Sequence, residues 1–120
     1  MSSMVRSPKK LAALRDVVAD SASLFAALGD KTRLRLVSRL SDGGPMSITR
    51  LAKGSRVTRQ AITKHLRVME HAGLVRSRRR GRESLWQVKP ERLADARRYL
   101  EMISRQWDEA LERLRQFVSD

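Results

Sequence analysis

The last quarter of the chain carries the pattern that most constrains what this protein can fold into. Apolar residues recur there every seven positions, in two sets that lie three residues apart. The first set is Leu93, Leu100, Trp107 and Leu114, and the second is Ala96, Ile103, Ala110 and Phe117. Such spacing forms the continuous apolar seam of a coiled-coil helix. Because Pro90 suits a first helical turn, the pattern predicts one long helix over residues 90–119.

This seam predicts that two copies of the chain associate. A chain of 120 residues has room for one domain with a modest core. Burying a large apolar side chain contributes roughly 1.5–3 kcal/mol, so an uncovered seam strongly favours association, and we expect the N-terminal helix to pack against it. The expected dimer interface consists of Leu93, Leu100, Ile103, Trp107, Leu114 and Phe117. The alternative is a helix that belongs to the core of a single chain.

The charge balance limits the classes of partner. The chain has 26 Lys and Arg against 13 Asp and Glu, which gives a net charge of +13. So basic a chain is expected to meet a polyanion, either nucleic acid or an acidic membrane surface. No apolar run approaches the roughly 20 residues of a membrane span, and the N-terminus lacks the apolar core of a secretory signal. We therefore expect a cytoplasmic, nucleoid-associated protein without a membrane partner.

The first third of the chain predicts helices. Residues 1–7 are polar and are expected to be disordered. Over residues 8–28, apolar residues recur at steps of three or four, which is typical of one helical face. The Asp20-Ser21 pair leaves open whether one helix or two form there. Asp30 is suited to cap a second helix that continues for about ten residues.

Two short helices joined by a tight turn indicate a helix-turn-helix over about residues 47–72. Ser47 can cap the first helix, Gly54 opens the turn, and Thr58 can cap the second helix. Apolar residues at steps of four and three mark the side of the second helix that should be buried. They are Ile62, Leu66 and Met69.

The outward side of this second helix carries the residue types that read base edges. Its members are Thr58, Arg59, Gln60, Thr63, Lys64 and Arg67. Glutamine can pair bidentately with adenine and arginine with guanine, while threonine suits a phosphate or a thymine methyl group. The N-terminal half of a recognition helix is the part that reaches the bases. This face is therefore predicted to bind DNA rather than to be a merely solvated polar surface.

A basic hairpin over residues 74–88 is predicted directly after this helix, with its turn at Arg80-Gly81-Arg82. Gly81 supplies the positive φ that a tight hairpin requires. Residues 46–48 could add a short edge strand. In this wing and its flanks, the arginines expected to hold phosphates or enter a minor groove are Arg56, Arg78, Arg80 and Arg82.

No constellation in the sequence points to catalysis or to a metal site. The chain has no cysteine, and His65 and His71 stand six residues apart without a third ligand nearby. The acids occur singly, so no nucleophile, base or acid pair converges. We expect no enzyme, no catalytic residue, no cofactor and no metal. Two rivals to sequence-specific DNA binding stay open: a non-specific nucleoid-type DNA-binding protein, and a basic module that docks an acidic protein.

Three segments, LFAALGDKTRLRLVSRL, VTRQAITKHLRVMEHAGLV and RRRGRESLWQV, carry a resemblance to known proteins. They are similar to the ArsR/SmtB family of prokaryotic winged-helix repressors, and the similarity covers about residues 24–88. The resemblance implies a homodimer that binds an inverted-repeat operator and represses transcription. The recognition helix would enter the major groove and the wing would lie along the backbone or minor groove. This match assigns operator reading to Thr58, Arg59, Gln60, Thr63 and Lys64, and the wing role to Arg80 and Arg82.

The chain departs from the metal-sensing members of that family. Many of them bind metal through a Cys-x-Cys run before the recognition helix, where this chain reads SITRLAKG, and others use histidines on the last helix, which has none here. Metal sensing is therefore not carried over. We expect a single domain over residues 8–120, a mainly α, dimeric winged helix-turn-helix with a small β-hairpin and long terminal dimerisation helices. Its expected role is transcriptional repression on double-stranded, dyad-symmetric DNA without a metal effector.

Overall fold

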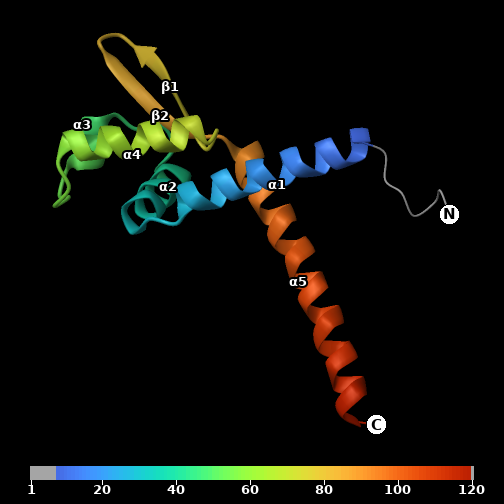
Figure 1. The fold of residues 1–120 in the computed structure, drawn as a ribbon. Coiled ribbons are helices and arrows are strands. Elements are labelled where there is room, and N and C mark those ends of the chain that lie inside the picture. Colours follow the sequence, from blue (N-terminus) through green and yellow to red (C-terminus); the bar gives the residue numbers. More distant parts are fainter. Residues whose placement is uncertain (1–7, 120) are drawn as a thin grey trace.

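The computed structural model describes residues 8–119, and the segment 1–7 that was expected to be disordered lies outside them. Figure 1 shows a small helical body with a two-stranded hairpin on one side and a long helix that leaves it. In chain order the elements are α1 (Pro8–Leu28), α2 (Lys31–Gly43), α3 (Ile48–Ala52), α4 (Arg59–His71), β1 (Val75–Arg80), β2 (Glu83–Val88) and α5 (Pro90–Ser119). The predicted class, mainly α with a small β-hairpin, is confirmed, and α1 is one continuous helix.

Three side-chain caps determine where the helices of the body begin. Asp30, Ser47 and Thr58 precede α2, α3 and α4, each with an extended backbone. Each side-chain oxygen accepts a hydrogen bond from the backbone N–H three residues later, at 2.9, 3.2 and 3.1 Å respectively. Such a bond satisfies one of the four N–H groups that the start of a helix leaves without a partner. The three predicted caps are confirmed.

The core lies where α2, α3 and α4 meet the base of the hairpin. The predicted buried side of α4 is confirmed, because Ile62, Leu66 and Met69 are at most 1% exposed. Trp86 of β2 is 2% exposed and belongs to the same cluster, as does Leu24 of α1. These contacts fix α4 against the body with its polar side outward.

The hairpin is tighter than the sequence predicts. The strands β1 and β2 pair antiparallel, and Arg80 lies opposite Glu83. The turn therefore contains only Gly81 and Arg82, and the prediction that Arg80 belongs to it is wrong. Gly81 has a φ of 63°, which fits the two-residue turns that suit the twist of paired strands.

The edge strand expected at residues 46–48 is reduced to one residue. Met46 exchanges two backbone hydrogen bonds with Trp86, of 2.9 and 2.8 Å. The pairing stops there because Ser47 caps α3, which begins at Ile48 and turns the backbone away from β2. Of the two structures that this segment could form, the capped helix therefore prevails.

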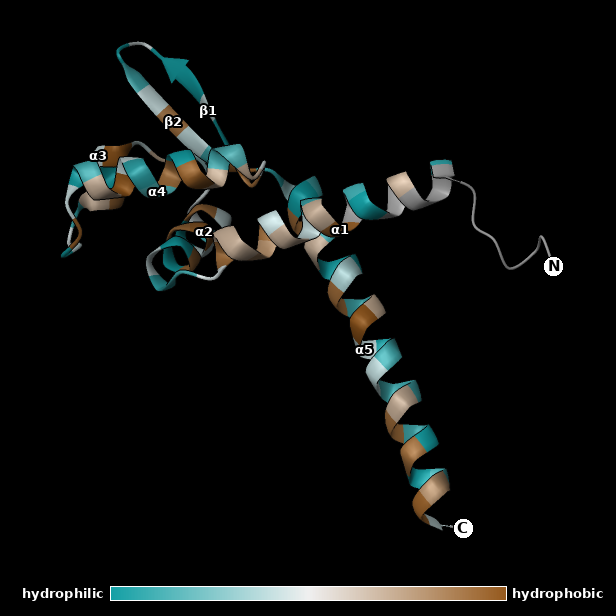
Figure 2. Ribbon diagram, in the orientation of Figure 1, coloured by the Kyte–Doolittle hydropathy of each residue, from teal (hydrophilic) through white to brown (hydrophobic). Residues whose placement is uncertain are grey.

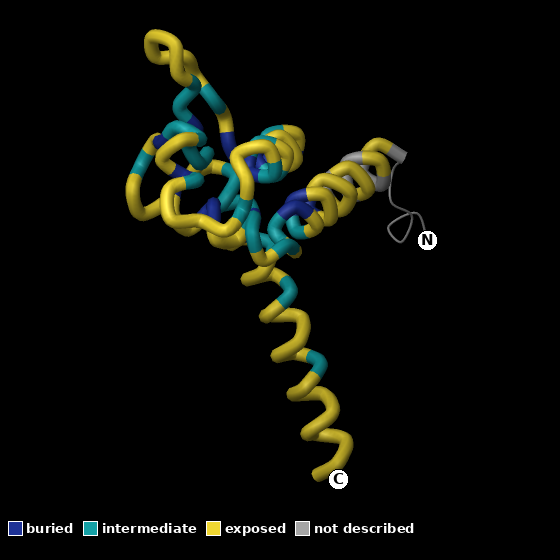
Figure 3. The backbone as a smooth tube through the Cα atoms, turned by 90° about the vertical axis from the view of Figure 1, so that its left-hand side faces the viewer, coloured by how far each residue is buried: buried dark blue, intermediate teal, exposed yellow. Residues whose placement is uncertain are grey.

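Most of α5 projects away from the body (Figure 1). The radius of gyration is 19.6 Å, whereas a compact chain of this length has about 14 Å. Apolar and polar bands alternate along the helix in Figure 2, and its outer part is exposed in Figure 3. Trp107 is 63% exposed and Phe117 is 82% exposed. The alternative of a helix buried in the core of a single chain is therefore wrong for this part of α5.

The first turns of α5 pack on the body instead. Ala96 is buried there, and Leu93 lies half-buried against the core of its own chain. Leu93, which the heptad pattern assigns to a dimer interface, thus buries part of its apolar surface within its own chain, because α5 still lies beside the body at this point. The ring of Tyr99 has its centroid 5.6 Å from that of Phe25 on α1, so the expected packing of the N-terminal helix on α5 is found at this crossing.

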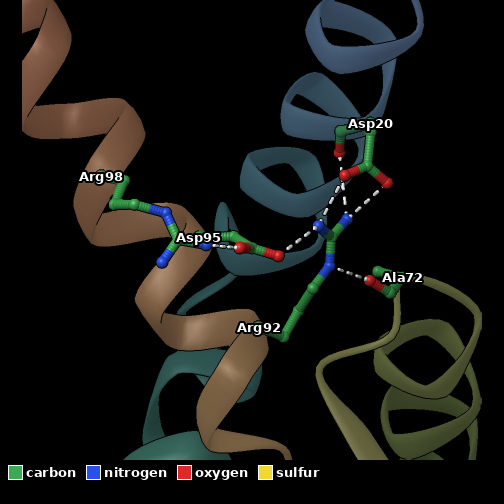
Figure 4. A network of polar contacts seen from close by, with 5 residues as sticks. All are labelled: Asp20, Ala72, Arg92, Asp95 and Arg98. Carbon is green, nitrogen blue, oxygen red and sulfur yellow. Dashed lines mark hydrogen bonds and ion pairs between the residues drawn. The ribbon is translucent and has the colours of Figure 1, made fainter.

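A largely buried arginine joins both terminal helices to the body (Figure 4). The guanidinium of Arg92 donates to the two carboxylate oxygens of Asp20 on α1, at 2.6 and 2.8 Å, and to the carbonyl of Ala72 after α4, at 3.0 Å. It also contacts Asp95, which pairs in turn with Arg98. The Arg92 side chain is 12% exposed, and its hydrogen bonds to Asp20 raise its pKa above the ordinary value. Three elements thus meet at one charged side chain.

Replacing Arg92 by alanine is expected to lower the free energy of unfolding by about 2 kcal/mol, because the Ala72 carbonyl and the Asp20 carboxylate lose a charged donor. Urea denaturation at one fixed protein concentration measures this loss. The matched control is Arg97→Ala, which removes an exposed ion pair with Glu101 and should change the free energy by at most about 0.5 kcal/mol. Equal losses in the two variants would contradict the joining role of Arg92.

Candidate nucleic-acid interface

The outward side of α4 presents the polar residues that the sequence predicts for it. Thr58, Gln60 and Lys64 are exposed, and Thr63 is half-buried. Together with Ala61, these four residues line one open concavity at the start of the helix. The Thr63 hydroxyl donates to a carbonyl of its own helix at 2.9 Å. Within residues 8–119, the side chains of Gln60 and Lys64 have no hydrogen-bond partner, so their polar groups face outward.

The two arginines of this face are held by other parts of the protein. The guanidinium of Arg59 donates to the hydroxyl of Thr49 on α3. Arg67 pairs with Glu70 at 3.0 Å, and its guanidinium carbon lies 5.5 Å from the centre of the Trp86 ring. A cation at that distance is attracted by the aromatic face. Both charges stay at the surface, but α3 and the hairpin set their positions.

The register of the hairpin separates its arginines by face. Successive side chains of a strand point to opposite faces, and Ser77 with its partner Trp86 marks the inner one. The outer face of β1 carries Arg76, Arg78 and Arg80. Arg82 stands in the turn at the tip, and Arg56 lies just before α4. All four residues predicted for the wing and its flanks are exposed, and two of them share one face.

A polar cluster links α4 to the start of α2. The Arg33 guanidinium donates to the carbonyl of Ala27 and lies 3.3 Å from Nδ1 of His65 on α4. The same His65 nitrogen is 3.8 Å from the Asp30 carboxylate. The hydrogen bond from the backbone N–H of Arg33 lowers the pKa of Asp30, and the charges of His65 and Arg33 act in the same direction. Arg33 and His65 therefore hold helices together.

Two residues that position this surface escape the sequence pattern. One is Thr49, which holds Arg59. The other is Arg39 of α2, whose guanidinium donates to the carbonyls of Leu51 and Arg50 on α3, at 2.7 and 3.3 Å. A cation at the C-terminal end of a helix satisfies carbonyls that lack an intrahelical donor. Helical spacing places Arg39 on the exposed side of α2, but only packing brings it to α3.

The side chains gathered at this surface are cations, amides and hydroxyls, which match phosphate groups and base edges. Among residues 8–119, no three His, Asp or Glu side chains are grouped closely enough to hold a metal ion. In that same part of the chain, no helix has both the length and the apolar character needed to cross a membrane.

Known proteins share this fold. A family model described as a helix-turn-helix domain matches residues 28–78. The helix-turn-helix-type transcriptional regulator Rv2034 of Mycobacterium tuberculosis is 37% identical over 94 residues, which cover 78% of this chain and 84% of that protein. The structure of an ArsR-like transcriptional regulator from Rhodococcus sp. RHA1 superposes with a TM-score of 0.73 and 38% identity, over 83% of this chain and 93% of that one. The chain belongs to the ArsR family of helix-turn-helix transcriptional regulators.

A further structure resembles this ArsR-family regulator over most of its length. It is the homodimeric winged helix-turn-helix DNA-binding domain of a possible ArsR-family regulator from Mycobacterium bovis, with a TM-score of 0.60 and 26% identity over 88% of this chain and 90% of that one. The family expected from three short segments is thereby confirmed, together with the winged helix-turn-helix fold and the class of DNA-binding transcriptional regulator.

The Asp30 cap should make part of the stability of this ArsR-family protein depend on pH. Its pKa is lower in the folded chain, so its contribution is present above the unfolded value of about 3.9 and is lost as pH falls through the folded value. Asp30→Ala is expected to lower the thermal unfolding midpoint at neutral pH and to approach the wild type below about pH 4. The control is Ser38→Ala, at an exposed site within α2. A constant difference down to about pH 3 would contradict this assignment.

Proposed function

We propose that this ArsR-family regulator is a homodimeric, sequence-specific repressor that binds an inverted-repeat operator without a metal effector. The observation that carries the proposal is the presence of two separate exposed surfaces on one chain, the polar face of α4 and the apolar seam of α5. The first suits base edges and the second suits another copy of the chain. The dimer would repress by occupying a promoter on the nucleoid, in the cytoplasm.

Base reading is assigned to the N-terminal half of α4. The amide of Gln60 and the amine of Lys64 have no partner within the described residues and border the concavity that begins at Thr58. A glutamine amide can pair bidentately with adenine. Arg59 lies beside them and its guanidinium is oriented by Thr49. A guanidinium group can pair bidentately with guanine. These side chains are therefore the ones that we expect to determine the operator sequence.

Phosphate binding is assigned to the wing and to the arginines that border α4. Arg78 and Arg80 lie on one face of β1, and Arg82 stands at the tip. Arginine pairs with phosphate oxygens whatever the base sequence. Arg56 and Arg67 lie before and after the reading residues and suit phosphates on either side. These residues should increase the affinity for DNA of any sequence rather than the preference for one operator sequence.

The exposed seam of α5 supports a homodimer. Leu100, Trp107 and Leu114 are 55%, 63% and 57% exposed, and large contiguous apolar surfaces are uncommon on monomers. The related Mycobacterium bovis domain is homodimeric. Two copies joined through α5, with α1 against it, would hold their α4 helices about one turn of DNA apart, roughly 34 Å. That spacing demands a dyad-symmetric site.

The proposal that no metal regulates this protein rests on two segments. These are the segments in which metal-sensing members of the family carry their ligands. The segment SITRLAKG, which contains α3, offers no thiolate, and α5 contains no histidine. Several acids of α5 are paired along the helix instead, such as Glu101 with Arg97 and Glu112 with Arg115, at 3.1 and 3.0 Å. Those carboxylates form ion pairs with arginines and are not grouped around a common metal site.

The reading residues and the wing should respond differently to substitution. On an operator selected from the protein's own genome, Gln60→Ala is expected to lose about 1–3 kcal/mol of preference at one base pair per half-site, with random duplex bound as before. Arg80→Ala is expected to weaken binding to both DNAs alike and to reduce the log–log salt slope by about 0.9. Fluorescence anisotropy titrations over a range of salt concentrations measure both effects.

Arg105→Ala is the control for this comparison, since it removes an exposed charge of α5 on the side away from the seam. Gln60→Ala and Arg80→Ala behaving alike on operator and random duplex would contradict the division of roles. If the wild type binds the two DNAs equally well, it is a non-specific DNA-binding protein. If it binds no duplex at low salt, an acidic protein becomes the better partner.

Replacing both Trp107 and Leu114 by serine is expected to convert the dimer into a monomer, because each buried side chain contributes roughly 1.5–3 kcal/mol. Light scattering after gel filtration measures the mass, and circular dichroism checks that the helices form. Operator affinity should fall by a hundredfold or more, on the order expected when two linked half-sites become independent. The control is again Arg105→Ala. A doubly substituted protein that stays dimeric would show that the seam is not the interface.

A further inference from the structure

A strongly basic groove lies between α2 and the turn that leads into α4. Its volume is about 500 Å³. The cations along its walls are Arg35 and Arg39 from α2, and Lys53 and Arg56 from the turn. All four are exposed, and none forms an ion pair with an acid of residues 8–119. The groove is lined by no Asp or Glu among these residues.

This lack of compensating acids distinguishes the groove from much of the basic surface of α5. On α5, Arg97 and Arg115 each pair with a glutamate within one turn. Of the four cations in the groove, only the Arg39 side chain has hydrogen-bond partners among the described residues. Its guanidinium donates to the carbonyls at the end of α3. Like charges brought together without an acid repel one another and favour the binding of an anion. The uncompensated charge of the groove therefore suits an anion.

The remaining lining suits a phosphate group. Thr32 and Ser55 contribute hydroxyls to the walls, and hydroxyls with arginine and lysine are the usual side-chain partners of phosphate oxygens. The Ser55 hydroxyl also accepts a hydrogen bond from the Val57 backbone N–H at 3.0 Å, which orients the turn. The groove opens to solvent, so it can admit one group of a longer polymer.

We propose that this groove binds a backbone phosphate of the DNA, next to the base pairs that α4 reads. The inference rests on the proposed function. The turn that forms one wall leads directly into Thr58, where the reading concavity begins, so the two surfaces are continuous along the chain. A phosphate held by Arg35 and Lys53 makes α2 a third element in contact with DNA. It also limits the angle at which α4 enters the major groove.

The test is the double substitution Arg35→Ala with Lys53→Ala, which leaves the bonds of Arg39 to α3 intact. Affinity for the selected operator and for one random duplex is expected to fall about tenfold at low salt, because the contact is sequence-independent, and the salt slope is expected to decrease by about 0.9. For the double variant, ethylation of one operator phosphate per half-site should no longer reduce binding, whereas it does so for the wild type. The control is Lys9→Ala with Arg105→Ala, which removes the same charge from exposed sites on α1 and α5.

The outcomes separate this inference from the function on which it rests. A wild type that binds no duplex would overturn the proposed function. If the wild type binds and the folded double variant keeps its affinity, salt slope and interference pattern, the function stands and the groove contact is wrong. A thermal-shift assay with millimolar pyrophosphate identifies the other source of phosphate. Stabilisation of the wild type alone, with unchanged DNA binding, would assign the groove to a free phosphate compound and overturn the DNA contact.

Discussion

The hydrogen bonds of one arginine join the terminal helices α1 and α5 to the end of α4. Arg92 reaches from α5 to Asp20 on α1 and to the carbonyl of Ala72 at the end of α4. Apolar contacts are non-directional, whereas a charged guanidinium with several partners requires a particular geometry. The Arg92 junction therefore contributes to the angle between α4 and the terminal helices. In a dimer built on α5, the distance between the two α4 helices depends on that angle.

The net charge of +13 is distributed unevenly over this framework. Several arginines of α5 pair with acids within about one turn, as Arg97 does with Glu101, so this helix carries charge of both signs beside its apolar seam. The groove beside the start of α4 contains cations without acids among the described residues. The same chain thus presents one surface suited to a polyanion and another suited to its own copy, and the Arg92 junction lies between them.

Features that depend on interactions between residues close in the sequence are predicted more accurately than features that depend on pairing between separate elements. Asp30, Ser47 and Thr58 cap helices through N–H groups three residues away, so local spacing is sufficient to find them. The hairpin turn is predicted one residue too long because its size depends on the pairing of Arg80 with Glu83 across the strands. Residues 46–48 suit a strand as well as a cap, and competition between Ser47 and the edge of β2 decides between them.

The sequence by itself determined the helix faces, the apolar seam of α5, the polar face of α4 and, through three short segments, the family. Each of these depends on residues a few positions apart or on a contiguous motif. Only the tertiary structure decided that Arg67 lies over Trp86 and that Leu93 packs within its own chain. The same holds for the meeting of Arg35 with Lys53 in one groove. Periodicity along a chain defines which face a residue occupies, but the packing of separate elements determines what that face meets.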